Sequence, residues 1–505
     1  MAPLHRRKRV EGALALGLLL LLPCGARADA IAPSQAETLQ QQLAAWLTGL
    51  LGPSIPLPDP PLRLTGEGDH YQATIPLPAL SGDAAVTASL RPLDNGRWAI
   101  DQVKLPSAAK FTLALPEKGD AAIGGPTAVD MHIGKQDTNA VIDPSLTTVS
   151  TVQADVRDIA VISDNPKQHQ EQRIDAYLAH STLQPTANGK LDLDVEATMQ
   201  GWRSASRMEG GTAVAIGAQQ FRAVGQIGGA SRERVTAAAA AATSLLATLP
   251  ARIAEKGSSP ELLPDERVQL RKLIAALDGM FQSVRLEETL DGLQVEVGGV
   301  GGVAIEHFRL ALGGEAPEGK LHTWFDFGFD GLDTPNLPPE VTAYLPHHFA
   351  FRPSLSGLRT TDVSALALDA TAETPDDKQL AIDAAAIFAH GGIDVGIETL
   401  AFDIGPAKVT GVGHLLMQAT DAWHGEARVA ATGLDALTEK VRSEPELQQA
   451  LPFLMMLRGL ARPDGDKLVW NIASDNGSLT VNGVDLSQLG GGKTKPKPLN
   501  QAPSR

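Results

Sequence analysis

Asn188-Gly189-Lys190-Leu-Asp-Leu-Asp-Val-Glu-Ala197 joins a turn dipeptide to a strict alternation of apolar and acidic residues. Asn-Gly favours the backbone angles of a tight hairpin turn. A period of two places the leucines and the valine on one face of a strand and the carboxylates on the other. Calcium would need six to eight oxygens from a curved loop, so we interpret these carboxylates as a solvated face. The stretch predicts an antiparallel hairpin with one apolar side.

The same period of two recurs on both sides of this hairpin. Upstream, a strand at 97–104 follows the turn Asp94-Asn95-Gly96, and alternation extends from residue 62 to about 225. The predicted strands at 147–162 and 171–183 are long, which favours a wide and strongly curved antiparallel sheet. Downstream, further strands are predicted at 292–297, 303–310, 324–330, 393–404 and 467–472.

Helical patterns occupy two places. The capping box Ser34-Gln-Ala-Glu37 predicts an amphipathic helix over about 35–51. Between 231 and 281 the pattern predicts an alanine-rich helix that ends near Pro250 and a second helix that begins at Pro264. Alanine-rich faces allow close packing, so these two helices are predicted to form a hairpin.

Together these patterns predict an α+β protein with two β-rich antiparallel halves, whose curved sheets are covered by amphipathic helices and separated by the helical hairpin. The predicted parts are a signal peptide at 1–28, an N-terminal helix with a β-rich domain at 29–228, the hairpin at 229–282, a C-terminal β-rich domain at 283–489 and a disordered tail at 490–505. In the C-terminal domain, Gly331-Leu-Asp333 and Gly433-Leu-Asp435 each precede Pro-Glu-x4-Leu-Pro, at 339–346 and 445–452. This internal repeat predicts one strand, turn and short helix used twice.

The first residues predict export. Arg6-Arg7-Lys8-Arg9, an apolar run at 13–22 and Ala26-Arg27-Ala28 follow the order of a secretory signal peptide. The run is shorter than the ~20 residues of a membrane-spanning helix, so cleavage near Ala28 is expected. An alternative is a lipoprotein anchored through Cys24, but Pro23 stands where a lipobox has a small residue, so plain cleavage is favoured.

Composition limits the partners. The formal net charge is −16, and the predicted leader is basic, so the rest of the chain is still more acidic. Such a surface repels nucleic acid and anionic headgroups, so no nucleic-acid partner is expected. Cys24 is the only cysteine, so the exported part would hold no disulfide. No stretch after the leader has the length of a transmembrane segment, so a soluble protein is expected.

Catalytic motifs are missing from the sequence. It contains no H-E-x-x-H, G-x-S-x-G or Walker pattern, and the doublet His347-His348 does not suit one metal in a strand. We therefore expect no catalytic, cofactor-binding or metal-ligating residues. The open alternative is a metal-independent hydrolase with a carboxylate pair, either Glu296 with Glu306 or Asp326 with Asp330.

Two stretches of the second half carry a family resemblance. They are Leu337-Pro-Pro-Glu with Tyr344-Leu-Pro-His-His-Phe-Ala-Phe-Arg-Pro-Ser-Leu-Ser-Gly357, and Ser474-Asp-Asn-Gly-Ser-Leu-Thr-Val-Asn-Gly-Val-Asp-Leu486. They resemble an uncharacterised family of secreted proteobacterial proteins, domain of unknown function 2125. The resemblance implies a periplasmic location and brings no catalytic residues.

These observations predict an exported envelope protein with a non-catalytic role in binding or assembly. A curved sheet with helices can form an apolar groove for a lipid, another hydrophobic ligand or a protein segment. The predicted groove residues are Phe453, Leu454, Met455, Met456, Leu457 and Leu460. Methionine-containing surfaces adapt to varied ligands, although a helix buried on the sheet explains the same residues.

Overall fold

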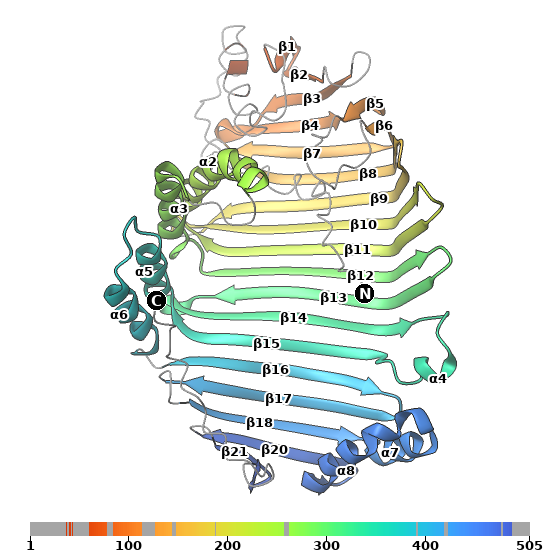
Figure 1. Cartoon of the computed structure of the whole chain (residues 1–505). Helices are drawn as coiled ribbons and strands as arrows, with labels where there is room; N and C mark the ends of the chain where they lie inside the picture. Colours follow the sequence, from red (N-terminus) through yellow and green to blue (C-terminus); the bar gives the residue numbers. More distant parts are fainter. Residues whose placement is uncertain are drawn as a thin grey trace. The chain divides into compact units, whose positions relative to one another are not determined.

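The computed structural model describes residues 37, 40, 41, 43, 60–77, 84–113, 127–143, 148–186, 188–256, 262–389, 392–418, 423–475 and 478–486. The predicted signal peptide with Cys24, the tail at 490–505 and most of the helix at 35–51 lie outside these residues. Strands make up 60% of the structure and helices 23%. The α+β prediction with two separate sheets is therefore wrong, because the described strands belong to one large antiparallel sheet that is not closed (Figure 1).

The chain forms two compact units, and β14 (Lys320–Asp333) contributes to both. Unit 1 comprises 1–319, 330–337 and 367–375, and its strand neighbours follow the order β1-β2-β3-β4-β7-β8-β9-β10-β11-β12-β13. The hairpin β5–β6 joins through β6, which pairs with β8 beyond the end of β7. The strand bounds are β1 Arg63–Glu67, β2 His70–Pro76, β3 Ala85–Pro92, β4 Trp98–Lys104, β5 Ala108–Leu113, β6 Thr127–Ile133, β7 Gln136–Asp143, β8 Thr148–Asn165, β9 Gln168–Pro185, β10 Leu191–Met208, β11 Ala213–Ala230, β12 Ser283–Val297 and β13 Gly301–Glu315.

The predicted helical hairpin exists but divides nothing. It consists of α2 (Arg232–Lys256) and α3 (Pro264–Leu277), and α2 continues past Pro250. The strands on either side of it, β11 and β12, pair with each other from Val214 and Val297 to Gly228 and Ser283. The hairpin is thus an insertion between neighbouring strands, which local periodicity could not distinguish from a linker between two sheets. Figure 1 shows α2 and α3 beside the strand ends rather than across the middle of the sheet.

A line of directly opposed residues crosses β8 to β13 and extends to Gly134, just after β6, and to Gly331 on β14. Ladder pairing stays in register on both sides of this line and skips the line residues themselves. Left-handed backbone angles (φ between 56° and 66°) occur on every second strand, at Asp158, Gly201, Gly292 and Gly331. Such residues bend a strand. We call this set the bend line; its members are Gly134, Asp158, Asp175, Gly201, Gln219, Gly292, Glu306 and Gly331.

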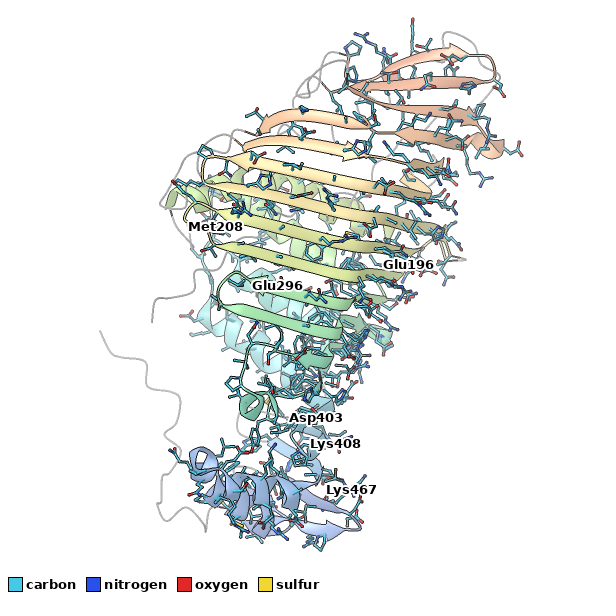
Figure 2. All side chains as sticks on the ribbon, turned by 90° about the vertical axis from the view of Figure 1, so that its right-hand side faces the viewer. Glu196, Met208, Glu296, Asp403, Lys408 and Lys467 are labelled. Atoms are coloured by element: carbon cyan, nitrogen blue, oxygen red, sulfur yellow. The ribbon has the colours of Figure 1, made fainter. Side chains whose placement is uncertain are left out.

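The bend line divides each long strand into two limbs. The long limbs are 148–157, 176–185, 191–200, 220–230, 283–291 and 307–315, and the short limbs run from the line to the hairpin turns. In Figure 1 the hairpin ends of β8 to β13 turn out of the direction of the long limbs, and in Figure 2 β10 crosses the view from Glu196 to Met208. The bend explains why such long strands curve strongly, as their length predicted.

Unit 2 comprises 320–329, 338–366 and 376–505. Its strands follow the order β15-β16-β17-β18-β20, and β19 and β21 share the far side of β20. Strand β16 matches its predicted range of 393–404. The bounds are β15 His348–Arg359, β16 Ile393–Ile404, β17 Ala407–Met417, β18 Trp423–Thr432, β19 Arg462–Asp464, β20 Lys467–Asp475, β21 Ser478–Val481 and β22 Val484–Asp485, with helices α4 Pro339–Thr342, α5 Thr360–Ala370, α6 Asp377–Ala389, α7 Leu434–Ser443 and α8 Leu451–Leu460.

The predicted repeat is present only in part. Each Pro-Glu segment begins a short helical turn, α4 in one copy and the 3-10 helix Pro445–Ala450 in the other. The Gly-Leu-Asp segments differ, because Gly331 belongs to the bend line within β14 whereas Gly433 (φ 70°) starts α7. Identical short motifs therefore serve two structural purposes in this chain.

Candidate functional site

The long limbs of unit 1 carry one apolar face, which we call the open face. Its side chains form rows across the strands, because the ladder register places them directly opposite each other. One row is bulky, with Val156, Tyr177, Met199, Phe221, Leu290 and Phe308. The next is small, with Ala154, Ala179, Ala197, Ala223, Glu288 and Leu310, and a third contains Val152, Ser181, Val195, Gly225, Leu286 and Leu312.

Much of the open face remains accessible to solvent. Leu286 and Leu312 are 45% and 41% exposed, and most other members are only half-buried. An antiparallel sheet of this size normally packs one face against a second layer. Helix α2 supplies such cover at one corner, where its Val235 packs on the buried cluster of Leu183, Leu191 and Ala230. Among the described elements we find no equivalent contact over the bulky and small rows.

The opposite face of the same limbs is polar and internally paired. Arg222 lies 2.8 Å from Glu196 across two strands, and His307 lies 2.7 Å from Asp291. Asp192 accepts a hydrogen bond from the backbone of Gly229, and Asp194 accepts one from Gln226. The prediction that the acidic residues of the first hairpin form a solvated face is confirmed. The two faces therefore differ sharply in chemistry although they share one layer of strands.

Tyr177 reports on the local environment of the open face. Desolvation by burial raises the pKa of its phenol, since the ionised form loses hydration there. Its neighbours in the bulky row are Val156 and Met199, which provide no compensating charge. Glu288, which pairs across the strands with Ala223 and Leu310, is the one carboxylic acid of these three rows.

The predicted groove residues on α8 fall on two sides of that helix. Leu454, Leu457 and Leu460 pack against the buried cluster of unit 2. Phe453, Met455 and Met456 point away and are 58%, 50% and 50% exposed. The six residues therefore do not line a common surface. Half of them belong to the core, which is what amphipathic spacing on a sheet-covering helix produces.

The candidate carboxylate pairs are not assembled by the fold. Glu296 pairs across the strands with Gly302, four positions from Glu306, so roughly 13 Å of strand separates the two acids. Asp326 and Asp330 are likewise four residues apart on β14, and Asp326 is buried. His348 begins β15, where its backbone N–H donates to Asp403, while His347 precedes the strand. No group of metal-binding side chains occurs among the residues that the structure describes.

The open face was missed by the sequence interpretation although its signal is present. On β13, Val303 and Ile305 occupy odd positions whereas Phe308 and Leu310 occupy even ones. The apolar phase slips by one residue at Glu306, on the bend line. The same slip separates Ile174 from Tyr177 on β9. A slip repeated at aligned positions of consecutive strands indicates one continuous bent sheet.

Within the described part of the chain, none of the helices is long and apolar enough to cross a membrane. Comparisons with known proteins give no relative: no family model matches the chain, and neither a curated protein nor a solved structure matches it. The resemblance to domain of unknown function 2125 therefore stays a prediction. The function proposed below is based on the geometry of the sheet.

Proposed function

We propose that the protein is an exported envelope protein that binds the hydrocarbon chain of a lipid on the open face of unit 1, without catalysis. The observation that carries this proposal is a wide apolar surface on a single layer of strands, half-buried in its bulky and small rows and exposed at Leu286 and Leu312. Exposed apolar patches of this extent mark interaction sites in soluble proteins. The predicted signal peptide supports the location.

A hydrocarbon chain suits this surface better than a peptide does. The face of a sheet offers side chains and no free backbone groups, since the strands use their N–H and C=O groups in the ladder. A peptide lying there would lose water from its own backbone without gaining partners. A polymethylene chain has no such groups. The alanines of the small row, from Ala154 to Ala223, span ~14 Å between two rows of larger side chains.

The first test places a charge on each side of the same strand. Ala179→Lys introduces an ammonium into the small row, whereas His180→Lys introduces it on the polar face opposite Glu196. We expect the first variant to weaken binding of the fluorescent fatty acid cis-parinaric acid by roughly tenfold or more, because a buried unpaired charge is costly. The second should bind as the unaltered protein does.

Circular dichroism of both variants controls for folding. Equal affinity of Ala179→Lys and the unaltered protein would contradict the proposal, and so would equal weakening by both variants. Native mass spectrometry of the full chain purified from the envelope fraction should show a co-purified lipid. Recovery of uncleaved protein from the cytosol would contradict the proposed export.

A further inference from the structure

The hairpin ends of unit 1 line an open pocket that lies outside the open face. Its volume is about 690 Å³, within the range of small-molecule sites. Small side chains of β10 and β11 form its floor, namely Ala205, Ala213 and Ala215. The turn 298–302 and residues Pro335 and Asn336 form one wall. Figure 2 looks onto this end of the unit, with Met208 and Glu296 marked.

The wall depends on a close approach that only glycine permits. Gly301 has φ of 134°, and a Cβ atom there would lie 2.7 Å from Nδ2 of Asn336. The absence of that atom lets Asn336 approach the turn and border the pocket. The turn and Asn336 therefore pack closely at the edge of the pocket.

Four ionisable side chains surround the alanine floor. The register places Glu171, Ala205, Ala215 and Glu296 in one row across the strands, and His169, Arg207 and Ala213 in the next. Glu171 is paired with Arg173 at 2.5 Å, and His169 with Asp164 at 2.5 Å. Within the described chain, the guanidinium of Arg207 and the carboxylate of Glu296 have no such partner.

The guanidinium of Arg207, unpaired among the described residues, differs from its neighbours on the sheet. Nearby arginines of the same sheet have partners: Arg203 lies 2.7 Å from Asp175 and Arg222 lies 2.8 Å from Glu196. Arg207 and Glu296 stand two strands apart, about 10 Å between their strands, on either side of β11 and its alanines. The pocket thus presents one positive and one negative group across an uncrowded floor.

We propose that this pocket binds a small zwitterion, with a phosphate or carboxylate on Arg207 and an ammonium on Glu296. A guanidinium forms two parallel hydrogen bonds to such an anion, which favours an anionic group at Arg207. The carboxylate of Glu296 accepts hydrogen bonds from an ammonium. This site is independent of the hydrocarbon-binding face, and either proposal can fail without the other.

The test titrates the full chain calorimetrically with phosphoethanolamine, and with phosphate or ethanolamine alone. We expect the zwitterion to bind more tightly than either half. Arg207→Gln and Glu296→Gln should each weaken it roughly tenfold, as expected for loss of a charge-assisted hydrogen bond. The matched control is Arg203→Gln, on the same strand and outside the pocket lining, and it should leave the affinity unchanged.

Vesicles of phosphatidylethanolamine distinguish the two sources of this chemistry. Binding of the free compound without vesicle binding assigns a soluble zwitterion, whereas vesicle binding that Arg207→Gln removes assigns a lipid headgroup. Failure to bind either form overturns the proposal. Equal affinity for phosphate alone, or equal weakening by Arg203→Gln, overturns it as well.

Discussion

The two units differ in how far helices cover the apolar side of their strands. In unit 2, α7 and α8 pack on the ends of β17, β18 and β20, and the contact buries Leu434, Leu437 and Trp470 to 7%, 7% and 8% exposure. Among the described residues of unit 1, the contact of α2 with the long limbs buries the corner around Leu183 and Leu191. Helices thus cover strands in unit 2, whereas the described helices leave most of the open face of unit 1 uncovered.

The two units also differ in what holds the sheet to its surroundings. The indole Nε1 of Trp470 donates a 2.8 Å hydrogen bond to the carbonyl of Leu457, which fastens β20 to α8. In the bulky row of the open face, Phe221 lies opposite Met199 and Leu290 on the neighbouring strands, and it belongs to no buried cluster among the described residues. Unit 2 therefore has a helix-covered core in this region. The open face is instead one surface of the sheet, and backbone hydrogen bonds between the strands hold its residues in place.

The largest expected effect is a loss of stability when the helix-covered region of unit 2 is disrupted. Trp470→Ala should lower the free energy of unfolding by about 3–5 kcal/mol, because it leaves a cavity under α8. Phe221→Ala should cost less, about 1–2 kcal/mol, because its side chain is only half-buried. Urea unfolding of both variants, followed by circular dichroism, measures the difference. Similar losses would show that the open face is buried and would remove the contrast between the units.

A smaller loss of stability is expected on substitution of a glycine in the bend line. Gly201→Ala should destabilise unit 1 by more than the ~1–2 kcal/mol of a left-handed non-glycine residue, since its Cβ would lie 1.9 Å from Oδ2 of Asp175. Gly189→Ala is the matched control, because φ there is 71° and the space around it is empty. Thermal unfolding should rank the two variants. Equal losses would mean that the bend line does not depend on close packing.

The smallest effect concerns the tyrosines. The chain has three, and burial raises the pKa of Tyr71, Tyr177 and Tyr344, the last to about 12 with Glu444 contributing. A raised phenol pKa stabilises the fold below about pH 10, and this contribution is lost as the pH rises through the folded-state pKa. A hydrocarbon on the open face should raise the pKa of Tyr177 further and leave the other two unchanged.

Ultraviolet titration of tyrosinate with and without cis-parinaric acid measures this shift, and Tyr177→Phe identifies its source. A ligand-induced shift that persists in Tyr177→Phe would place the hydrocarbon elsewhere. Because Tyr177 belongs to the open face and Tyr344 to unit 2, the same titration compares the two regions within one sample.

The sequence by itself determined the local elements. Asn188-Gly189 specified the turn between β9 and β10, with φ of 71° at Gly189, and the alternation after it specified which residues are solvated. The helices α2 and α3 were likewise predicted, as was the long span of β8. These are properties of neighbouring residues, so a period of two or 3.6 is enough to reveal them.

Only the tertiary structure decided how these elements combine. The pairing of β11 with β12 joins strands separated by the whole helical hairpin, and no local pattern encodes that contact. The open face exists because Tyr177, Phe221 and Leu290 lie in one row across the strands, and Arg207 and Glu296 border one pocket because their strands flank β11. Apolar phase tells which residues share a face of one strand, but the ladder register alone decides which strands supply their neighbours.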